Sequence, residues 1–327
     1  MIGRSEAFRT VQALIDKMAM FDAPVLIEGE TGTGKELAAR AIHYRGPRRN
    51  GPFVPLNCGA LPDQLIENEL FGHRRGAFTD ARDDQPGLIA LARTGTLFLD
   101  EVDMLTAKGQ VTLLRFLQDQ QFRPLGARQE QQGDVRIIAA CNRSLERQVA
   151  AGEFRLDLLY RLKLMHLRLP PLRERNGDIA LLARHFLEVG SVRFDKPAIP
   201  LGSATLAWFE RYHWPGNIRE LENLILREFL LADGPQISIP DSAAAPEPGP
   251  PTDCSPLNYR YAKNQAITEF ESRYLARLIE HANGNVSAAA RISGTERRHL
   301  GRLLKKYRIA LRAEPDTRTE GNLGSPP

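Results

Sequence analysis

Cysteine is scarce in this sequence. Its 327 residues include Cys58, Cys141 and Cys254, which are far apart and form no CxxC pair, as expected of free thiols in a reducing compartment. Long apolar runs are missing too: none approaches the roughly 20 residues that a membrane span requires, and the first ten residues have no signal-peptide core. No repeat of fixed period is present. The sequence therefore predicts a cytoplasmic protein without a membrane span.

Length and charge indicate more than one domain. A chain of 327 residues is longer than one core usually supports, and a composition of 42% hydrophobic and 26% charged residues is typical of soluble globular proteins. Residues 259–312 hold 12 Lys and Arg against 4 Asp and Glu, although the whole chain carries only +4. A basic module on an acidic body suggests a tethered nucleic-acid binder.

Proline marks the boundary of this module. Residues 240–257 contain 6 prolines in 18 positions, too many for a helix or a paired strand. We therefore expect an extended linker at 240–256, before the basic module at 257–312. The last residues, 313–327, lack apolar periodicity, which predicts a disordered tail.

The body before the linker alternates apolar runs with segments of helical periodicity. This order favours βα units and a buried parallel sheet, an α/β fold. The expected strands are PVLIE (24–28), FVPLN (53–57), TLFLD (96–100), VRIIAAC (135–141) and MHLRL (165–169).

The strongest motif follows the first expected strand and opens a helix. GETGTGKE has the glycines, lysine and strand-loop-helix setting of a loop that cradles the phosphates of ATP, with Lys35 supplying a full charge. A simple glycine-rich turn is the alternative. Glu36 stands where a hydroxyl usually helps to hold Mg²⁺, and we take it as one candidate ligand. The candidate nucleotide-binding residues are Gly29, Glu30, Thr31, Gly32, Thr33, Gly34, Lys35 and Glu36.

An acidic pair ends the third expected strand. In TGTLFLDEVD, Asp100 is placed to hold Mg²⁺, directly or through water, while Glu101 orients and deprotonates the attacking water. A strand end that simply meets solvent is the alternative. The position of the pair, about 65 residues after Lys35, favours the catalytic interpretation.

Seven motifs in one order resemble those of bacterial sigma-54-dependent transcription activators. They are GETGTGKE, ELFGHRRGAFTDAR, GTLFLDE, VRIIAACNRSL, FRLDLLYRL, LPPLRER and WPGNIREL. The resemblance covers about residues 1–235 and implies an AAA+ ATPase that works as a hexameric ring and remodels the sigma-54 RNA polymerase closed complex. It implies an α/β subdomain at 1–170 and a helical lid at 171–239.

Five further polar residues take roles from this resemblance. Asn57 matches the asparagine that holds the catalytic glutamate, and Asn142 matches the sensor near the γ-phosphate. Arg155 and Arg161 match arginine fingers that reach a neighbouring subunit; six residues apart on one helix they would point about 120° apart. Arg219 matches the second sensor, on a helix that Asn217 is expected to cap.

The segment GAFTDA resembles GAFTGA, the surface loop with which these activators contact sigma-54. An aromatic ring that is exposed in the free protein and becomes buried in a partner contributes on the order of 2 kcal/mol to the free energy of binding. Phe78 is therefore the expected contact. Asp80 replaces the usual glycine; aspartate tolerates positive φ, but its charge would face sigma-54 and DNA. The expected contact residues are Gly76, Ala77, Phe78, Thr79, Asp80 and Ala81.

The basic module resembles a Fis-type helix-turn-helix that reads upstream DNA. A short helix NVSAAARIS and a turn at Gly294 precede a second helix, which Thr295 is expected to cap and whose buried stripe is Leu300, Leu303 and Leu304. An earlier helix, Ile267 to Ile279, suggests dimer pairing. The candidate DNA-binding residues are Thr295, Arg297, Arg298, His299, Arg302, Lys305 and Lys306.

The AAA+ portion begins almost at Met1, which leaves no room for an input domain. Relatives without one are commonly held in check by a separate protein, so a negative regulator in trans is expected; a truncated chain is the alternative. Two other functions stay open. One is a regulator on the same scaffold that no longer contacts sigma-54, which Asp80 favours. The other is an AAA+ unfoldase or chelatase-type motor with an incidental basic tail.

Overall fold

The computed structural model describes two compact units, Met1–Ala244 and Ala245–Pro327. Their boundary falls inside the expected linker. The described residues are 1–60, 62, 65–78, 81–232, 234, 236, 237, 239, 275, 278, 279, 282, 285–293, 295 and 297–306, with the side chains of His299, Lys305 and Lys306 left out. Cys254, the linker and the tail lie outside them.

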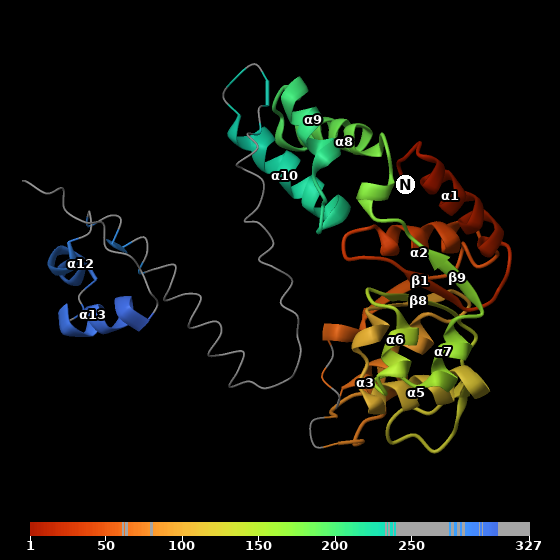
Figure 1. Ribbon diagram of the computed structural model, residues 1–327. Coiled ribbons are helices and arrows are strands. Elements are labelled where there is room, and N and C mark those ends of the chain that lie inside the picture. The colour runs from red at the N-terminus through yellow and green to blue at the C-terminus, as the bar shows by residue number, and fades with distance from the viewer. Residues whose placement is uncertain are drawn as a thin grey trace, which may run out of the picture. The chain divides into compact units, whose positions relative to one another are not determined.

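A five-stranded parallel sheet is the centre of the first unit (Figure 1). Each expected strand is present, three of them one residue shorter than expected, so the α/β prediction is confirmed. The spatial order is β2-β5-β8-β1-β9. The strands are β1 (Val25–Glu28), β2 (Phe53–Asn57), β5 (Thr96–Asp100), β8 (Arg136–Cys141) and β9 (Met165–Arg168).

Helices cover both faces of the sheet because side chains alternate along each buried strand. Leu97 and Leu99 pack into one core cluster, whereas Phe98 packs into the other. The second cluster lies under α1 (Glu6–Ala19) and α2 (Lys35–Tyr44). The first cluster is covered by α3 (Ile66–Phe71), α4 (Leu88–Leu91), α5 (Ala107–Asp119), α6 (Leu145–Ala150) and α7 (Leu156–Leu162).

Two short antiparallel ribbons and three 3₁₀ turns were not expected from the sequence. Their segments are too short to carry a periodic signal. The ribbons pair β3 (Gly72–His73) with β4 (Gln85–Pro86) and β6 (Gln121–Phe122) with β7 (Gln131–Gln132), and the turns are η1 (Cys58–Ala60), η2 (Val102–Met104) and η3 (Leu172–Glu174).

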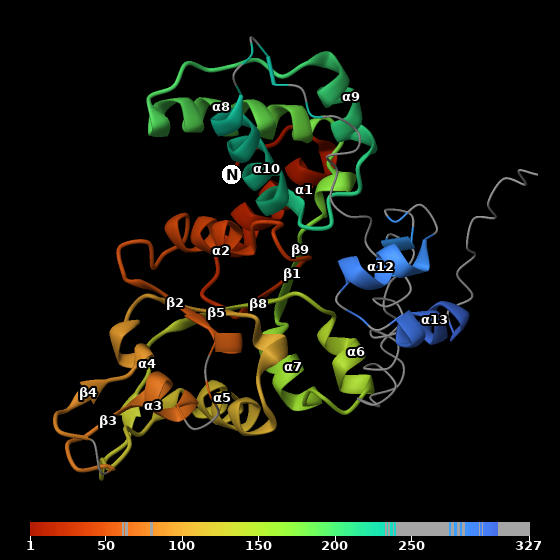
Figure 2. The same cartoon turned by 90° about the vertical axis from the view of Figure 1, so that its left-hand side faces the viewer.

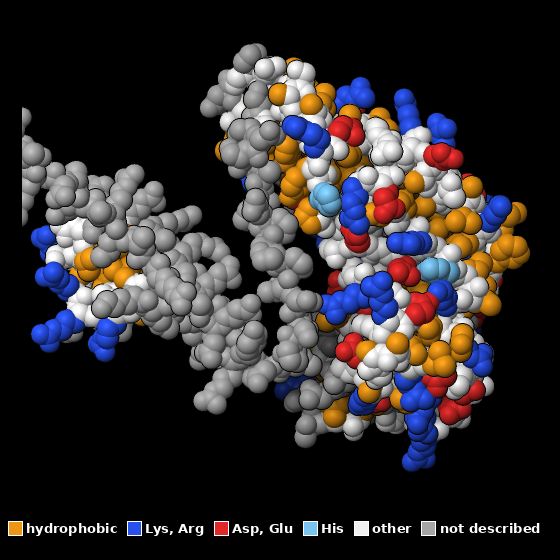
Figure 3. All heavy atoms as spheres, in the orientation of Figure 1, with side chains coloured by type: hydrophobic (Ala, Val, Ile, Leu, Met, Phe, Trp, Pro, Cys, Tyr) orange, Lys and Arg blue, Asp and Glu red, His pale blue; other side chains and the backbone are white. Residues whose placement is uncertain are grey.

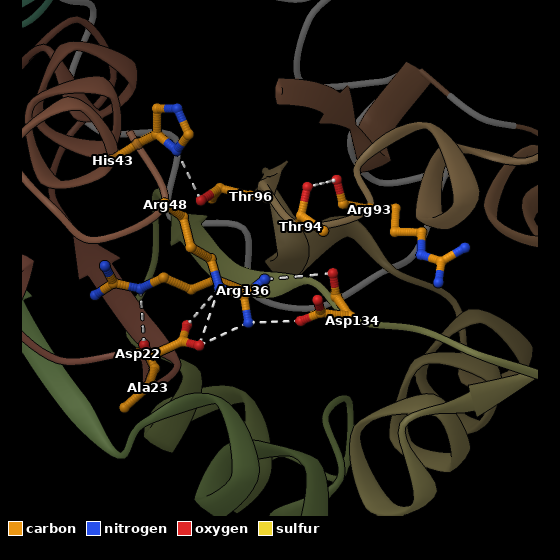
Figure 4. A network of polar contacts seen from close by, with 9 residues as sticks. All are labelled: Asp22, Ala23, His43, Arg48, Arg93, Thr94, Thr96, Asp134 and Arg136. Atoms are coloured by element: carbon orange, nitrogen blue, oxygen red, sulfur yellow. Dashed lines mark hydrogen bonds and ion pairs between the residues drawn. The ribbon is translucent and has the colours of Figure 1, made fainter. Parts of the chain in front are cut away.

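A network of charges fastens the amino-terminal ends of the strands (Figure 4). Arg136, which begins β8, is buried, and its guanidinium donates to the carbonyls of Met18 (2.8 Å) and Ala23 (3.2 Å). Arg48 bridges Asp22 and Asp134 at 2.6 and 2.7 Å. The two carbonyl groups are neutral acceptors that satisfy the buried guanidinium of Arg136. All of these contacts lie near the amino-terminal ends of the strands, so the opposite, carboxyl ends remain free for other chemistry.

Three helices form a lid that belongs to the same unit (Figure 2). They are α8 (Asp178–Phe194), α9 (Ser203–Arg211) and α10 (Asn217–Leu231), packed around an aromatic core that includes Trp214 and Phe229. Leu221 and Ile225 face this core as expected, and Ile218 is half-buried. None of the helices in the described part of the chain is long and apolar enough to cross a membrane.

A buried ion pair fixes the lid to the start of the chain. The Asp178 carboxylate accepts from Arg175 at 3.0 Å, and it also accepts from the backbone amides of Arg4 (2.5 Å) and Ser5 (3.0 Å). Burial alone would raise the pKa of Asp178, but these donors hold it below its usual range. Asp178 therefore remains charged within a fully buried position.

The second unit contains α12 (Val286–Ile292) and α13 (Arg297–Lys306). Asn285 caps α12 by accepting from the amides of Ser287 and Ala288. Leu300 and Leu304 are buried, as expected. The structure describes α13 from Arg297 and leaves residue 296 out; the Thr295 hydroxyl donates to the Ser293 carbonyl at 3.3 Å, and the expected cap at Thr295 stays a prediction.

Candidate functional site

The carboxyl ends of β1, β5 and β8 bring the expected site residues together. The glycine-rich loop follows β1, and α2 begins at Lys35 after Gly34, whose φ of +93° is a conformation that favours glycine. The Lys35 ammonium is buried and donates to the carbonyls of Gly29 (2.8 Å) and Glu30 (3.1 Å) and to Asn142 Oδ1 (2.7 Å). The loop thus has the form of a phosphate cradle at a helix amino terminus.

Burial disfavours the charged forms of Lys35 and Asp100 in this site. Burial lowers the pKa of Lys35, although Asp100 acts in the opposite direction. Burial likewise raises the pKa of Asp100, against the effect of Lys35. Both shifts disfavour the charged forms, so a bound anion beside Lys35 and a bound cation beside Asp100 would each relieve a desolvation cost.

Glu101 lies next to Asn142 at the end of β5. Its backbone is left-handed, with φ of +56°, and its Oε1 accepts from Asn142 Nδ2 at 3.3 Å. The carboxylate of Asp103 accepts from the backbone amide of Asn142 at 3.2 Å and so holds the backbone of Asn142 in place. Asp103 was missed in the sequence, although it is the third acidic residue of LDEVD.

Asn57 ends β2, the strand next to β5 in the sheet. Its Oδ1 accepts from the amides of Gly59 (2.8 Å) and Ala60 (3.2 Å) in its own loop. A Cβ atom on Gly59 would lie 2.7 Å from Glu101 Oε2 and 3.3 Å from Asn57 Oδ1, so both side chains end close to Gly59. The role of Asn57 as the holder of Glu101 stays a prediction.

The donor set resembles a magnesium site that is completed by phosphate. Among the described residues, no group of three or more His, Cys, Asp or Glu could hold a metal ion. Mg²⁺ in nucleotide enzymes usually takes one or two carboxylates together with phosphate oxygens and waters, and the half-buried Asp100 fits that pattern. Glu36 is exposed and paired with Arg40 at 2.8 Å, and its role as a ligand stays a prediction.

A cavity of about 320 Å³ adjoins the start of α2. It is lined by side chains from the amino terminus, the glycine-rich loop and the lid, a combination that no single sequence motif indicated. Its walls are largely apolar, which suits a planar aromatic base attached to a phosphate chain in the loop. The lining residues are Met1, Ile2, Phe8, Thr33, Gly34, Leu37, Arg175, Leu182, His185, Phe186, Ile218 and Glu222.

The lid contacts the tip of the glycine-rich loop through the start of α10. Ile218 donates its amide to the Gly32 carbonyl at 3.0 Å. A Cβ atom on Gly32 would come within 3.2 Å of Arg219 Cβ, so the structure places the exposed Arg219 beside the loop. The expected cap at Asn217 is wrong, because Asn217 is the first helical residue and its buried side chain binds the loop instead.

The two expected arginine fingers do not share a helix. Arg155 precedes α7 with φ of −78° and ψ of +132°, and its guanidinium pairs with Asp157 at 2.7 Å. Arg161 lies in the last turn of α7 and is exposed. The 120° argument assumed one continuous helix and was therefore wrong.

The loop that carries Phe78 projects from the β3–β4 ribbon. Phe78 is 44% exposed and its ring lies 4.9 Å from that of His73. The backbone amide of Gly76 donates a hydrogen bond to the Ala81 carbonyl at 2.8 Å. A Cβ atom on Gly126 would lie 2.9 Å from Ala77 Cβ, so the backbone of Gly126 lies close to Ala77. Thr79 and Asp80 lie outside the described residues.

The second unit presents a basic surface. Arg297, Arg298 and Arg302 are exposed on α13 opposite the buried Leu300 and Leu304. In Figure 3 the Lys and Arg side chains gather along one side of this unit, whereas the first unit mixes both signs on the face shown. A one-sided basic helix is suited to phosphate and base-edge contacts.

Three family models cover most of the chain in the order of these parts. Residues 1–168 match the sigma-54 interaction domain, residues 173–247 the AAA+ ATPase lid domain, and residues 266–307 the bacterial regulatory protein of the Fis family. The chain belongs to the sigma-54 activator family. The fold and family expected from the sequence are thereby confirmed.

Relatives that match the chain are longer than it. The hydrogenase transcriptional regulatory protein HoxA of Bradyrhizobium diazoefficiens is 42% identical over 92% of the chain and 62% of its own length. The response regulator PilR of Pseudomonas aeruginosa is 42% identical over 94% of the chain and 70% of its length. The crystal structure of NtrX from Brucella abortus in complex with ATP has a TM-score of 0.72 at 32% identity, over 94% of the chain and 69% of that protein.

Proposed function

We propose that this activator hydrolyses ATP, binds upstream DNA and uses the energy to remodel the sigma-54 RNA polymerase closed complex. The observation that carries the proposal is the convergence of Lys35, Asp100, Glu101 and Asn142 at one edge of the sheet. The ATP bound in the related NtrX structure supports nucleotide binding by this fold.

Each residue at this edge has a distinct chemical task. Lys35 and the loop amides neutralise the β- and γ-phosphates, and Glu101 orients the attacking water and accepts its proton. Asn142, which contacts both Lys35 and Glu101, holds these two groups in register. Mg²⁺ bound with the nucleotide would further neutralise the phosphate charge, and Asp100 is the residue that would hold it.

Self-association completes the site in this proposal. The exposed Arg161, together with Arg155, would reach the nucleotide of a neighbouring copy, where a guanidinium stabilises charge on the transferred phosphoryl group. A hexameric ring of copies provides such neighbours. Arg219 would contact the nucleotide from the lid of its own chain. A separate negative regulator acting on this ring is part of the proposal.

Phe78 is the proposed point at which hydrolysis acts on sigma-54. Its ring is exposed on a narrow loop whose base is fixed by a bond between Gly76 and Ala81 and by the Arg74–Asp84 ion pair. A fixed base and an exposed tip allow the loop to move as one element when the underlying helices shift. The basic surface of α13 holds the activator on DNA near the promoter.

Open-complex formation on a sigma-54 promoter with purified polymerase tests this function. Lys35→Ala should abolish both ATP hydrolysis and promoter opening. Phe78→Ala should retain hydrolysis and lose opening, whereas Phe21→Ala, which alters another exposed phenylalanine (60%), should retain both. A Phe78→Ala protein that opens promoters as well as the parent would refute the proposed mechanism.

A second function is favoured by Asp80, which replaces the glycine usual in this loop. A carboxylate there would repel DNA and could remove sigma-54 contact, leaving a regulator that acts with another polymerase. If the native loop is inactive at sigma-54 promoters and Asp80→Gly restores activity, this second function is correct. If the native protein opens sigma-54 promoters and Asp80→Gly opens them equally well, this second function is excluded.

A further inference from the structure

The side chain of Glu30 turns away from the phosphate cradle and binds the lid. Arg173, in η3 at the beginning of the lid, donates to both carboxylate oxygens, at 2.8 and 2.5 Å. Asn217, at the start of α10, donates to Oε2 at 3.1 Å. These donors hold the pKa of Glu30 below its usual range, with Arg173 as the main cause. One carboxylate of the glycine-rich loop therefore joins two separate segments of the lid.

Asn217 extends this contact to the backbone of the loop. Its side chain is fully buried and donates to the Thr31 carbonyl at 3.0 Å, while its Oδ1 accepts from the Leu172 amide at 2.8 Å. Its neighbour Ile218 donates to the Gly32 carbonyl at 3.0 Å. The lid thus binds two consecutive carbonyl groups at the tip of the loop.

These two bonds determine where the loop amides point. A trans peptide group is planar, with its carbonyl and its N–H on opposite sides, and no cis peptide bond occurs in the described part of the chain. Because the carbonyls of Thr31 and Gly32 face the lid, the amides of Gly32 and Thr33 face the interior of the loop. The Thr33 amide indeed lies 3.3 Å from the Glu30 carbonyl, inside the loop.

We propose that Glu30 is a positioning residue for nucleotide binding: by holding Arg173 and Asn217, it keeps the lid on the loop and its amides directed at the phosphates. This inference rests on the proposed ATPase function. Both partners of the Glu30–Arg173 pair are more than a third exposed, so their attraction alone stabilises the fold little. The effect of the pair is to preorganise the loop for nucleotide. By thermodynamic linkage, bound nucleotide strengthens the contact between lid and loop by the same free energy by which that contact strengthens nucleotide binding.

Nucleotide affinity in a double-mutant cycle tests the proposal in the full chain. The variants are Glu30→Gln, Arg173→Met and the double mutant, and the probe is ADP carrying a fluorescent methylanthraniloyl group. We expect each single change to raise the Kd about fivefold, the upper range for a bidentate pair near a surface. The double mutant should be no weaker than the weaker single mutant, because the residues act as one unit.

Hydrogen exchange supplies a readout that a merely structural pair would not change. The Gly32 and Thr33 amides should exchange faster in both single variants, and added ADP should protect the lid less than in the parent. Glu174→Gln is the matched control, since Glu174 is an exposed glutamate beside Arg173, and it should leave the Kd unchanged.

The outcomes separate this inference from the proposed function. If the parent binds no labelled ADP, the nucleotide function itself fails. If the parent binds but Glu30→Gln and Arg173→Met bind equally well, only the inference is wrong, even where their melting temperatures fall. If one single variant does not fold, the other decides.

Discussion

Gly32 and Gly34 offer a matched pair of substitutions that tests the contact between lid and loop. Both have positive φ, +79° and +93°, so alanine at either position carries a similar backbone cost, about 1 kcal/mol. They differ in surroundings. A Cβ atom on Gly32 would lie 2.2 Å from the carbonyl oxygen of Gly216, whereas the nearest atom to a Cβ on Gly34 is Leu37 Cδ1 at 3.9 Å.

The magnitudes follow from these distances. Gly34→Ala should cost only the backbone term of about 1 kcal/mol. Gly32→Ala must also displace a backbone carbonyl at the start of α10, and overpacking of this kind adds about 2 kcal/mol. For a unit of this size 1 kcal/mol shifts the melting temperature by about 3 °C. We therefore expect Gly34→Ala to melt about 3 °C, and Gly32→Ala about 9 °C, below the parent.

Calorimetry without nucleotide is the appropriate assay, because bound phosphate would add its own contacts to both glycines. The measured quantity is the difference between the two variants, in which the shared backbone term cancels. Equal shifts for Gly32→Ala and Gly34→Ala would refute the reasoning, since they would mean that the start of α10 does not rest on the loop in solution.

Three further predictions concern other parts of the molecule. Asp178→Asn leaves Arg175 buried without its charged partner and should lower the free energy of unfolding by about 3 kcal/mol or more, measured by denaturant titration. Burial lowers the pKa of His43 in the folded protein. Below a pH of about 6.5 the unfolded chain therefore binds a proton on this histidine more readily than the folded chain does, so the free energy of unfolding should fall on acidification from pH 7.5 to 5.5. It should fall less steeply in His43→Gln. Arg302→Ala should weaken DNA binding and reduce the salt slope by about one unit, whereas the exposed Arg291 on α12 serves as the control substitution in the same filter-binding titration.

The sequence by itself determined the strands, the glycine-rich loop and the family. Strands that are buried on both faces appear as continuous apolar runs, so their positions depend on local composition and were found to within one residue. Asp100 ends such a strand, Glu101 and Asn142 directly follow one, and Lys35 follows the loop after another. The carboxyl ends of parallel strands meet at one edge. Their convergence was therefore predictable before any distance was known.

Only the tertiary structure decided what the side chains at the lid do. Asn217 has the residue type of a helix cap, and local rules assigned it that role, but the nearby loop carbonyls and Glu30 provide better partners once the lid is folded. Arg155 likewise belongs by sequence to a helical segment but lies outside the helix and pairs with Asp157. Contacts between segments more than 140 residues apart, such as Glu30 with Arg173, leave no periodic signal in the sequence, because they depend on how whole elements pack.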